Sequence, residues 1–328
     1  MKSAEHLVSV VIPAYNAERT IDETLRSVRS QSHCHLEIIV VDDGSVDDTI
    51  VVAERHAAQD SRIRIIRQKN EGVAAARNRG WQHACSDLIA FIDADDLWAP
   101  TKIELQLEAL VSAGEQTGLV YSWYALIDEK SRVIMNGEPA YCAGDVLDYI
   151  FSGNFIGNGS AVLVRRQALL AANGFESGLR TAGAQGCEDF LFYCRVAETY
   201  QFAVVPDYLI GYRFLPENMS SNLPRMMRSW MLVIDEMILR HPDRVASLQS
   251  GLRNYGSWVL VRALTSGQLR YFAKSLYLLS QRNPTMTLKL LVCDLPRESF
   301  IVVKNKLLAL RKREHRKSRL FFSIGNPG

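Results

Sequence analysis

The chain has 328 residues, of which 48% are hydrophobic and 23% charged, and 38 Lys and Arg nearly balance 36 Asp and Glu. This ordinary globular composition excludes wholesale disorder, collagen-like repeats and a coiled coil. No apolar run approaches the roughly 20 residues that a membrane-spanning helix needs. The N-terminus shows no signal-peptide pattern, so we expect a cytoplasmic protein.

Predicted strands and helices alternate over about the first 100 residues. The predicted strands cover residues 8–12, 36–41, 62–67 and 88–92, with a helix after each of the first three. Pro13 is expected to end the first strand, and Thr20 with Glu23 to form a capping box at the first helix. Strands separated by helices of this length predict an α/β fold with a Rossmann-like, mainly parallel sheet flanked by helices.

After Asp96 the pattern becomes less regular. Helices are predicted over 100–111 and 188–199, and strands over 118–127, 160–165, 202–205 and 208–212. From residue 226 onward the pattern is mostly helical, so we place an approximate domain boundary near residue 224. The chain then runs into a basic segment, 304–319, which holds eight Lys or Arg and one Glu. The body of the protein is therefore mildly acidic.

Acidic side chains follow the predicted strands at their carboxyl ends, where open parallel sheets bind ligands. They are Asp42, Asp43, Asp93, Asp95 and Asp96. Carboxylates at this density repel one another unless a cation compensates them. Mg²⁺ or Mn²⁺ bound to both the carboxylates and a polyphosphate would offset this repulsion, because these ions prefer carboxylate and phosphate oxygens. The alternative is helix capping, which suits Asp47 or Asp48 but does not explain the cluster at 93–96.

The chain has no GxGxxG after the first strand and no GxxxxGK[ST] anywhere, which argues against a Rossmann dehydrogenase and a P-loop NTPase. A phosphate group would therefore be bound by a metal ion and by basic side chains rather than by a Gly-rich loop. Arg77 and Arg79 begin a helix rich in small residues that can approach a ligand closely. The alternative for both is a solvated helix face.

Four segments in this order and spacing carry a resemblance to a known family: VSVVIPAYNAERTIDETLRSV, IIVVDDGSVDDT, NEGVAAARNRG and IAFIDADDLW. Together they resemble family 2 glycosyltransferases, which are inverting enzymes of the GT-A fold that use nucleotide-diphospho-sugars. The resemblance is strong over about residues 7–110 and weaker to about 220. It implies a catalytic domain over 1–224, with a nucleotide-binding half (about 1–110) and an acceptor half (about 111–224), followed by a helical region over 225–328 with its basic tail.

The resemblance also implies roles for individual residues. The donor nucleotide-sugar would be bound by Pro13, Tyr15, Asn16, Asp43, Asn70, Arg77, Asp93 and Ala94. Asp43 would hydrogen-bond the base, and Arg77 would contact the nucleotide. Asp93 and Asp95 form the DxD pair, and they would hold the metal, Mg²⁺ or Mn²⁺, with Asp96 as an additional contact. The acceptor would lie over 158–160 and 183–186.

Inversion by single displacement needs a general base on the acceptor side. Glu188-Asp189 matches the family's Glu-Asp motif at the start of a helix, and we expect Asp189 to be the base, with Glu188 second. The helix N-terminus is expected to keep this base ionised; the alternative is that the pair caps the helix. Many relatives have a His after the Tyr-Arg stretch, but this chain has Phe214-Leu215 after Tyr212-Arg213. Arg213 or residues 218–221 are the candidates to replace it.

The expected partners are a donor, with a uridine nucleotide as the family's commonest choice, and a glycan or lipid-linked glycan acceptor. Bacterial cell-surface polysaccharide biosynthesis is the setting that the resemblance implies. The C-terminal helices are expected to pack on the catalytic domain; the alternative is peripheral contact of residues 300–319 with an anionic membrane, and nucleic acid is not an expected partner. Two other functions stay open: a sugar nucleotidyltransferase, and a nucleotide-sugar-binding or scaffold protein with a lapsed active site.

Overall fold

The computed structural model describes residues 6–184, 186–215, 219–298, 300 and 321–323. These residues form a nine-stranded sheet in the order β3-β2-β1-β4-β8-β6-β9-β5, with β7 paired to β6. The strands are β1 (Val8–Ala14), β2 (Leu36–Asp42), β3 (Ile63–Arg67), β4 (Leu88–Phe91), β5 (Leu97–Trp98), β6 (Thr117–Ile127), β7 (Val133–Asn136), β8 (Val162–Arg165) and β9 (Gln201–Arg213).

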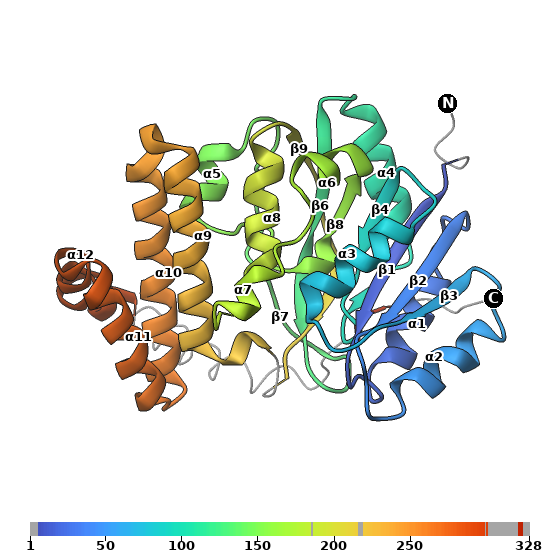
Figure 1. Ribbon diagram of the computed structural model, residues 1–328, viewed down its shortest axis with the longest axis horizontal. Helices are drawn as coiled ribbons and strands as arrows, with labels where there is room; N and C mark the ends of the chain where they lie inside the picture. Colours follow the sequence, from blue (N-terminus) through green and yellow to red (C-terminus); the bar gives the residue numbers. More distant parts are fainter. Residues whose placement is uncertain (1–5, 185, 216–218, 299, 301–320, 324–328) are drawn as a thin grey trace, which may run out of the picture.

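Helices cover the sheet and continue beyond it at one end (Figure 1). They are α1 (Ile21–Arg29), α2 (Thr49–Ala57), α3 (Val73–His83), α4 (Lys102–Ser112), α5 (Leu147–Ser152), α6 (Arg166–Ala171), α7 (Gly178–Thr181), α8 (Glu188–Ala197), α9 (Leu223–Arg240), α10 (Val245–Thr265), α11 (Leu269–Arg282) and α12 (Pro284–Lys289). Within the described ranges, none of them combines the length and hydropathy needed to cross a bilayer. The predicted α/β architecture with a helical C-terminal region is confirmed.

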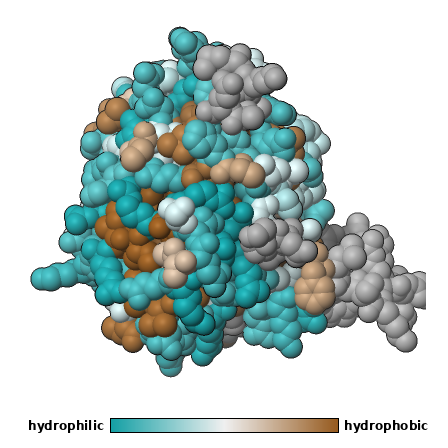
Figure 2. All heavy atoms as spheres, turned by 90° about the vertical axis from the view of Figure 1, so that its right-hand side faces the viewer, coloured by the Kyte–Doolittle hydropathy of each residue, from teal (hydrophilic) through white to brown (hydrophobic). Residues whose placement is uncertain are grey.

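The N-terminal half of the sheet is parallel throughout: β1 pairs with β2 and β4, and β2 pairs with β3. Every residue of β1 is buried, as its continuous apolar run predicts. Helix α3 lies so close to β1 that a Cβ on Gly80 would stand 2.2 Å from Cγ1 of Val11. Because β1, β2 and β4 run parallel, their carboxyl ends lie at one edge of the sheet. The N-terminus of α3 lies at this edge, where Asp43 accepts a hydrogen bond from the N–H of Gly72. At the β3 end of the sheet, hydrophilic side chains cover most of the surface and apolar ones gather in a limited area (Figure 2).

The C-terminal half of the sheet is mixed, because β8 runs antiparallel to both β4 and β6 while β6 and β9 are parallel. The two predicted strands 202–205 and 208–212 are wrong as separate elements. They form one 13-residue strand, β9. The register passes from Ser122 opposite Val205 to Trp123 opposite Tyr208. A bulge thus absorbs the two intervening residues, one of them a proline, and lets pairing continue.

Two predictions for the first βα unit are wrong. Pro13 does not end β1 but lies inside it, opposite Val41. The pairing with β4 ends at Val11, so β1 has a partner on one side only at Pro13, where the missing N–H is tolerated.

The capping box is not formed either: Thr20 occupies the N-cap position without a side-chain cap hydrogen bond. The Glu23 carboxylate instead accepts hydrogen bonds from Ser131 Oγ, at 2.6 Å, and Arg213 Nη2, at 2.8 Å.

The C-terminal helices pack on the rest of the protein and share its hydrophobic core. Trp230 of α9 stacks on Phe190 of α8, with ring centroids 4.0 Å apart and an angle of 13° between the rings. Helix α9 begins at Leu223, next to the predicted boundary at 224. The proposed membrane segment, 300–319, lies outside the described residues except for Phe300, which is exposed.

Candidate active site

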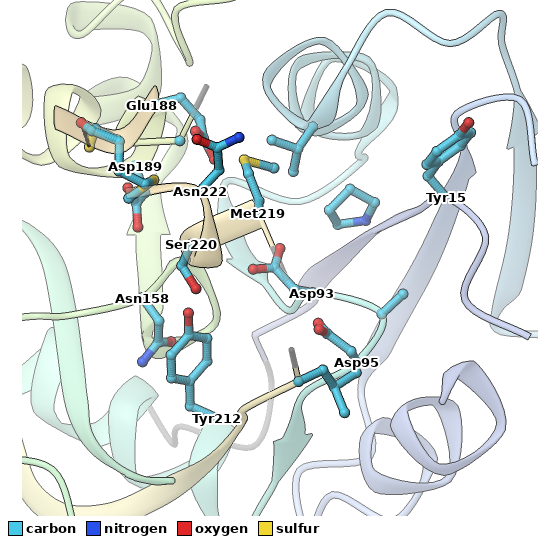
Figure 3. A pocket seen from close by; sticks show the side chains of 18 of the residues that line it. Tyr15, Asp93, Asp95, Asn158, Glu188, Asp189, Tyr212, Met219, Ser220 and Asn222 are labelled. Atoms are coloured by element: carbon cyan, nitrogen blue, oxygen red, sulfur yellow. Dashed lines mark hydrogen bonds between the residues drawn. The ribbon is translucent and has the colours of Figure 1, made fainter. Parts of the chain in front are cut away.

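A cavity of about 1450 Å³ opens at the carboxyl ends of β1, β2 and β4. It is lined by nearly all of the residues predicted to form the site: Pro13, Tyr15, Asn16, Asp43, Asn70, Arg77, Asp93, Ala94, Asp95, Glu188 and Asp189. Tyr15 lies on one side of the cavity, Glu188 and Asp189 lie on the opposite side, and the carboxylates of Asp93 and Asp95 lie between them (Figure 3). The structure thus brings together residues from both predicted halves of the domain.

Asp96, predicted as an additional metal contact, does not line the cavity. Its side chain is fully buried. Ser160 Oγ donates to Asp96 Oδ2 at 2.5 Å, and the backbone N–H of Arg213 donates to Oδ1 at 2.9 Å. Both oxygens therefore hold the loop after β4 against η2 (Gly159–Ala161) and the end of β9.

Asp93 and Asp95 face the cavity with their carboxylates. Burial, followed by the charge of Asp93, raises the pKa of Asp95 to about 7. Among the described residues, no group of three or more His, Cys, Asp or Glu is arranged as a metal site. Mg²⁺ commonly uses only one or two protein carboxylates and takes its other ligands from substrate phosphates and water. Two carboxylates beside an open cavity, one of them with a pKa raised by burial, fit such an ion.

Arg77 is almost fully buried between the two acidic groups of the cavity. Its Nη2 lies 2.6 Å from Asp93 Oδ1, and its Nη1 lies 2.7 Å from Glu188 Oε1. Burial by itself would lower the pKa of Arg77, but the surrounding carboxylates outweigh burial and raise it. Gly159 makes room for this arrangement, because a Cβ there would stand 2.3 Å from Arg77 Nη2. Arg77 thus ties the strand-end carboxylates to the start of α8.

Glu188 and Asp189 occupy the first turn of α8, after Cys187 in a left-handed backbone conformation (φ 63°). Glu188 is engaged by Arg77, whereas Asp189 forms no ion pair within the described parts of the chain and accepts a hydrogen bond from the backbone N–H of Phe190 at 2.7 Å. Burial and then the charge of Glu188 raise the pKa of Asp189 to about 7. The expectation that the helix N-terminus keeps this carboxylate ionised is therefore wrong below neutral pH, because burial outweighs the helix dipole.

The other side of the cavity is shaped by Asp43. Its Oδ1 accepts hydrogen bonds from Gln68 Nε2, at 2.7 Å, and the backbone N–H of Glu71, at 2.8 Å, and its Oδ2 accepts one from the N–H of Gly72 at 2.8 Å. This carboxylate fixes the turn into α3. Tyr15 is half-exposed beside it, with its ring free to contact a ligand.

Arg213 does not reach the cavity. It is buried, with Nε donating to the carbonyl oxygen of Asp95 at 2.6 Å and Nη1 to that of Asp128 at 3.0 Å. Arg213 thus supports the loop that carries Asp95 and does so without lining the cavity. Residue 218 lies outside the described residues, whereas Ser220 and Asn222 line the cavity.

The sequence did not indicate a group of cavity-lining residues from the C-terminal part of the chain: Tyr212, Phe214, Trp230, Tyr255, Trp258 and Arg262. In the sequence, Trp258 belongs to an amphipathic helical stripe and Arg262 stands on its own. No local motif indicates that either one faces the cavity, because only the packing of α9 and α10 on α8 brings them there.

Comparisons with known proteins agree with this arrangement. Residues 9–170 match the family described as "Glycosyl transferase family 2". The chain is 36% identical over 169 residues to the putative glycosyltransferase EpsH of Bacillus subtilis, covering 50% of this chain and 48% of that protein. It is 35% identical over 130 residues to the Escherichia coli UDP-Glc:alpha-D-GlcNAc-diphosphoundecaprenol beta-1,3-glucosyltransferase WfgD, covering 39% of this chain and 50% of that protein. The chain thus matches these relatives over about half of their length.

Two solved structures share the fold. Staphylococcus aureus TarS 1-349 in complex with UDP-GlcNAc superposes with a TM-score of 0.61 at 18% identity, over 82% of this chain and 79% of that one. The mannosyltransferase PcManGT from Pyrobaculum calidifontis, in complex with GDP-Man and Mn²⁺, gives 0.57 at 19% identity, over 95% and 88%.

Proposed function

The chain belongs to glycosyl transferase family 2 and has a GT-A fold, and we propose that it transfers a glycosyl group from a nucleotide-diphospho-sugar to an acceptor hydroxyl with inversion. One observation carries this proposal. The cavity places two metal-compatible carboxylates, Asp93 and Asp95, opposite Asp189, a carboxylate with a pKa near neutrality and no ion-pair partner in the described structure. A donor site and a base facing each other are what a single displacement requires.

We place the nucleotide between Pro13, Tyr15 and Asp43, at the carboxyl end of β1, with Asn16, Asn70 and Ala94 around it. A uridine nucleotide is our proposed donor, supported by the TarS structures with UDP and UDP-GlcNAc. Asp95 and Asp93 would hold Mg²⁺ or Mn²⁺. When bound, such an ion offsets negative charge on the diphosphate. Because Asp96 has both oxygens engaged and does not line the cavity, we leave it out of the metal site.

In the proposed reaction, the acceptor oxygen forms a bond to the anomeric carbon while the bond from that carbon to the diphosphate oxygen breaks. The electron pair of the broken bond leaves with the diphosphate, and Asp189 takes the proton of the acceptor hydroxyl. A pKa near 7 suits this role, because about half of the groups are ionised at neutral pH and the carboxylate is still basic enough to accept a proton. Arg77 has two carboxylate partners already, which supports a positioning role for it rather than direct contact with the nucleotide.

Bacterial cell-surface polysaccharide synthesis is the setting that we propose, with a growing glycan or lipid-linked glycan as acceptor. Relatives named for amylovoran biosynthesis in Erwinia amylovora and for teichuronic acid biosynthesis in Bacillus subtilis support it. We further propose that residues 1–224 form the catalytic unit. The helical region that follows would complete the acceptor side, since α9 and α10 contribute to the cavity lining.

Calorimetry with UDP, dTDP and GDP, each with and without Mn²⁺, tests the donor site. We expect Mn²⁺-dependent binding of one nucleotide, lost in Asp95→Ala. Asp189→Asn should keep that binding but lose release of UDP from UDP-glucose or UDP-N-acetylglucosamine. Asp87→Asn is the matched control, because the Asp87 side chain is 95% exposed and lies outside the cavity. Failure of all three nucleotides to bind the folded protein would refute the proposal.

A further inference from the structure

The end of the cavity formed by the C-terminal helices differs in chemistry from the donor end. Arg262 of α10 lies there between two aromatic rings: its Cζ is 5.0 Å from the ring centroid of Trp258 and 5.4 Å from that of Phe214. Both residues line the cavity and are partly exposed to solvent, at 46% for Trp258 and 44% for Phe214. The planar guanidinium is thus held in a fixed orientation by aromatic contacts.

Within the described ranges, no carboxylate forms an ion pair with Arg262. Another cation, Arg225, lines the same cavity. Burial lowers the pKa of Arg262, with the hydroxyl groups of Tyr212 and Tyr255 as the nearby groups that counter this effect. A partly desolvated guanidinium without an acidic partner is costly in the free protein. An anionic ligand would supply a counter-charge that none of the described carboxylates provides through an ion pair.

A continuous stack of rings connects this arginine to the proposed base. Phe190, the residue after Asp189, stacks on Trp230, which stacks on Tyr255 at 4.0 Å and 6°. The ring of Tyr255 is in turn 5.5 Å from that of Trp258. Tyr255 lies close enough to both Asp189 and Arg262 for each charge to affect its pKa. Arg262 is therefore connected to the side of the cavity that holds the proposed base, and α8, α9 and α10 lie side by side to hold it there (Figure 1).

We propose that Arg262, with Trp258 and Phe214, forms a subsite for an acidic sugar residue of the acceptor, binding a carboxylate or phosphate group carried by that sugar. This inference rests on the proposed function and adds the chemical class of the acceptor. A guanidinium binds both anions through paired, charge-assisted hydrogen bonds, whereas a neutral sugar gains no such interaction.

Ligand-detected NMR titration of the full chain tests this subsite, with UDP and Mn²⁺ present to occupy the donor site. The probes are methyl β-D-glucuronide for a carboxylate, glucose 1-phosphate for a phosphate, and methyl β-D-glucoside as the neutral counterpart. We expect at least one charged sugar to bind about tenfold more tightly than the neutral one. The probe that binds better identifies which anion the acceptor carries.

Arg262→Gln should remove the preference for charged sugars, and Arg262→Lys should retain part of it. Arg270→Gln is the matched control, because Arg270 is exposed on α11 and does not line the cavity. Equal binding of charged and neutral sugars by the wild type, no binding of either charged sugar, or an unchanged preference in Arg262→Gln would overturn the inference. Binding of UDP with Mn²⁺, measured on the same samples, separates this failure from a failure of the proposed function.

Discussion

Replacing Asp95 by Asn should stabilise the metal-free protein while removing metal-dependent donor binding. The side chain of Asp95 forms no described hydrogen bond to another residue, so the change removes charge without breaking a contact. The pKa of Asp95 rises from 3.8 to about 7 in the folded protein, chiefly through burial and Asp93. At about 1.36 kcal/mol per pH unit, this corresponds to about 4 kcal/mol. Because the group is partly exposed and shares the effect with Asp93, we expect about 2 kcal/mol.

The sign of the pH dependence follows from this raised pKa. Below about pH 3, Asp95 is protonated in both the folded and the unfolded chain, so the substitution has little effect there. As pH rises from about 4 to about 7, the unfolded chain releases the proton and the folded protein retains it, so the wild type loses stability. The advantage of Asp95→Asn should therefore grow over this range and be complete above pH 7.

Urea unfolding in EDTA at pH 5 and pH 8 measures this difference, with Asp87→Asn as the exposed control. Adding Mn²⁺ and UDP should then stabilise the wild type by mass action and leave Asp95→Asn unchanged. Equal or lower stability of Asp95→Asn than of the wild type at pH 8 would refute the reasoning. It would mean that Asp95 is not electrostatically strained in the free protein.

Three further outcomes are expected. The value of kcat/KM should rise with pH, reach half its maximum near pH 7 and level off above about pH 8, since burial raises the pKa of Asp189 to about 7 and the base must be ionised. A profile that is flat from pH 5 to 8 would exclude Asp189 as the base. Gly159→Ala should lower kcat at least about tenfold by displacing Arg77, whose Nη2 would lie 2.3 Å from the new Cβ, whereas wild-type kcat would contradict a positioning role. Gly80→Ala should lower the free energy of unfolding by about 1–3 kcal/mol through its clash with Val11, measured by urea unfolding.

The donor half of the site could be predicted from the sequence because its geometry is local. A buried apolar run makes a parallel strand, and whatever follows the run lies at the shared carboxyl edge of the sheet. Pro13, Asp43 and Asp93 therefore reach one cavity from segments far apart in the chain. The Glu-Asp pair at the start of α8 is predicted by the resemblance to the family's Glu-Asp motif and not by this geometry.

Only the tertiary structure determines which of these charged side chains are held in ion pairs or hydrogen bonds and which are available to a ligand. Arg77 and Glu188 are 111 positions apart, and no periodicity indicates that they form an ion pair. Ser160 and the backbone of Arg213 turn Asp96 inward, although it follows Asp95 directly in the sequence. Arg262 reaches the cavity because α10 packs on α9 and α9 on α8. The pattern that predicts a strand or helix depends on residues close together in the chain. The ion-pair partner of a charged side chain depends instead on which distant elements pack against it.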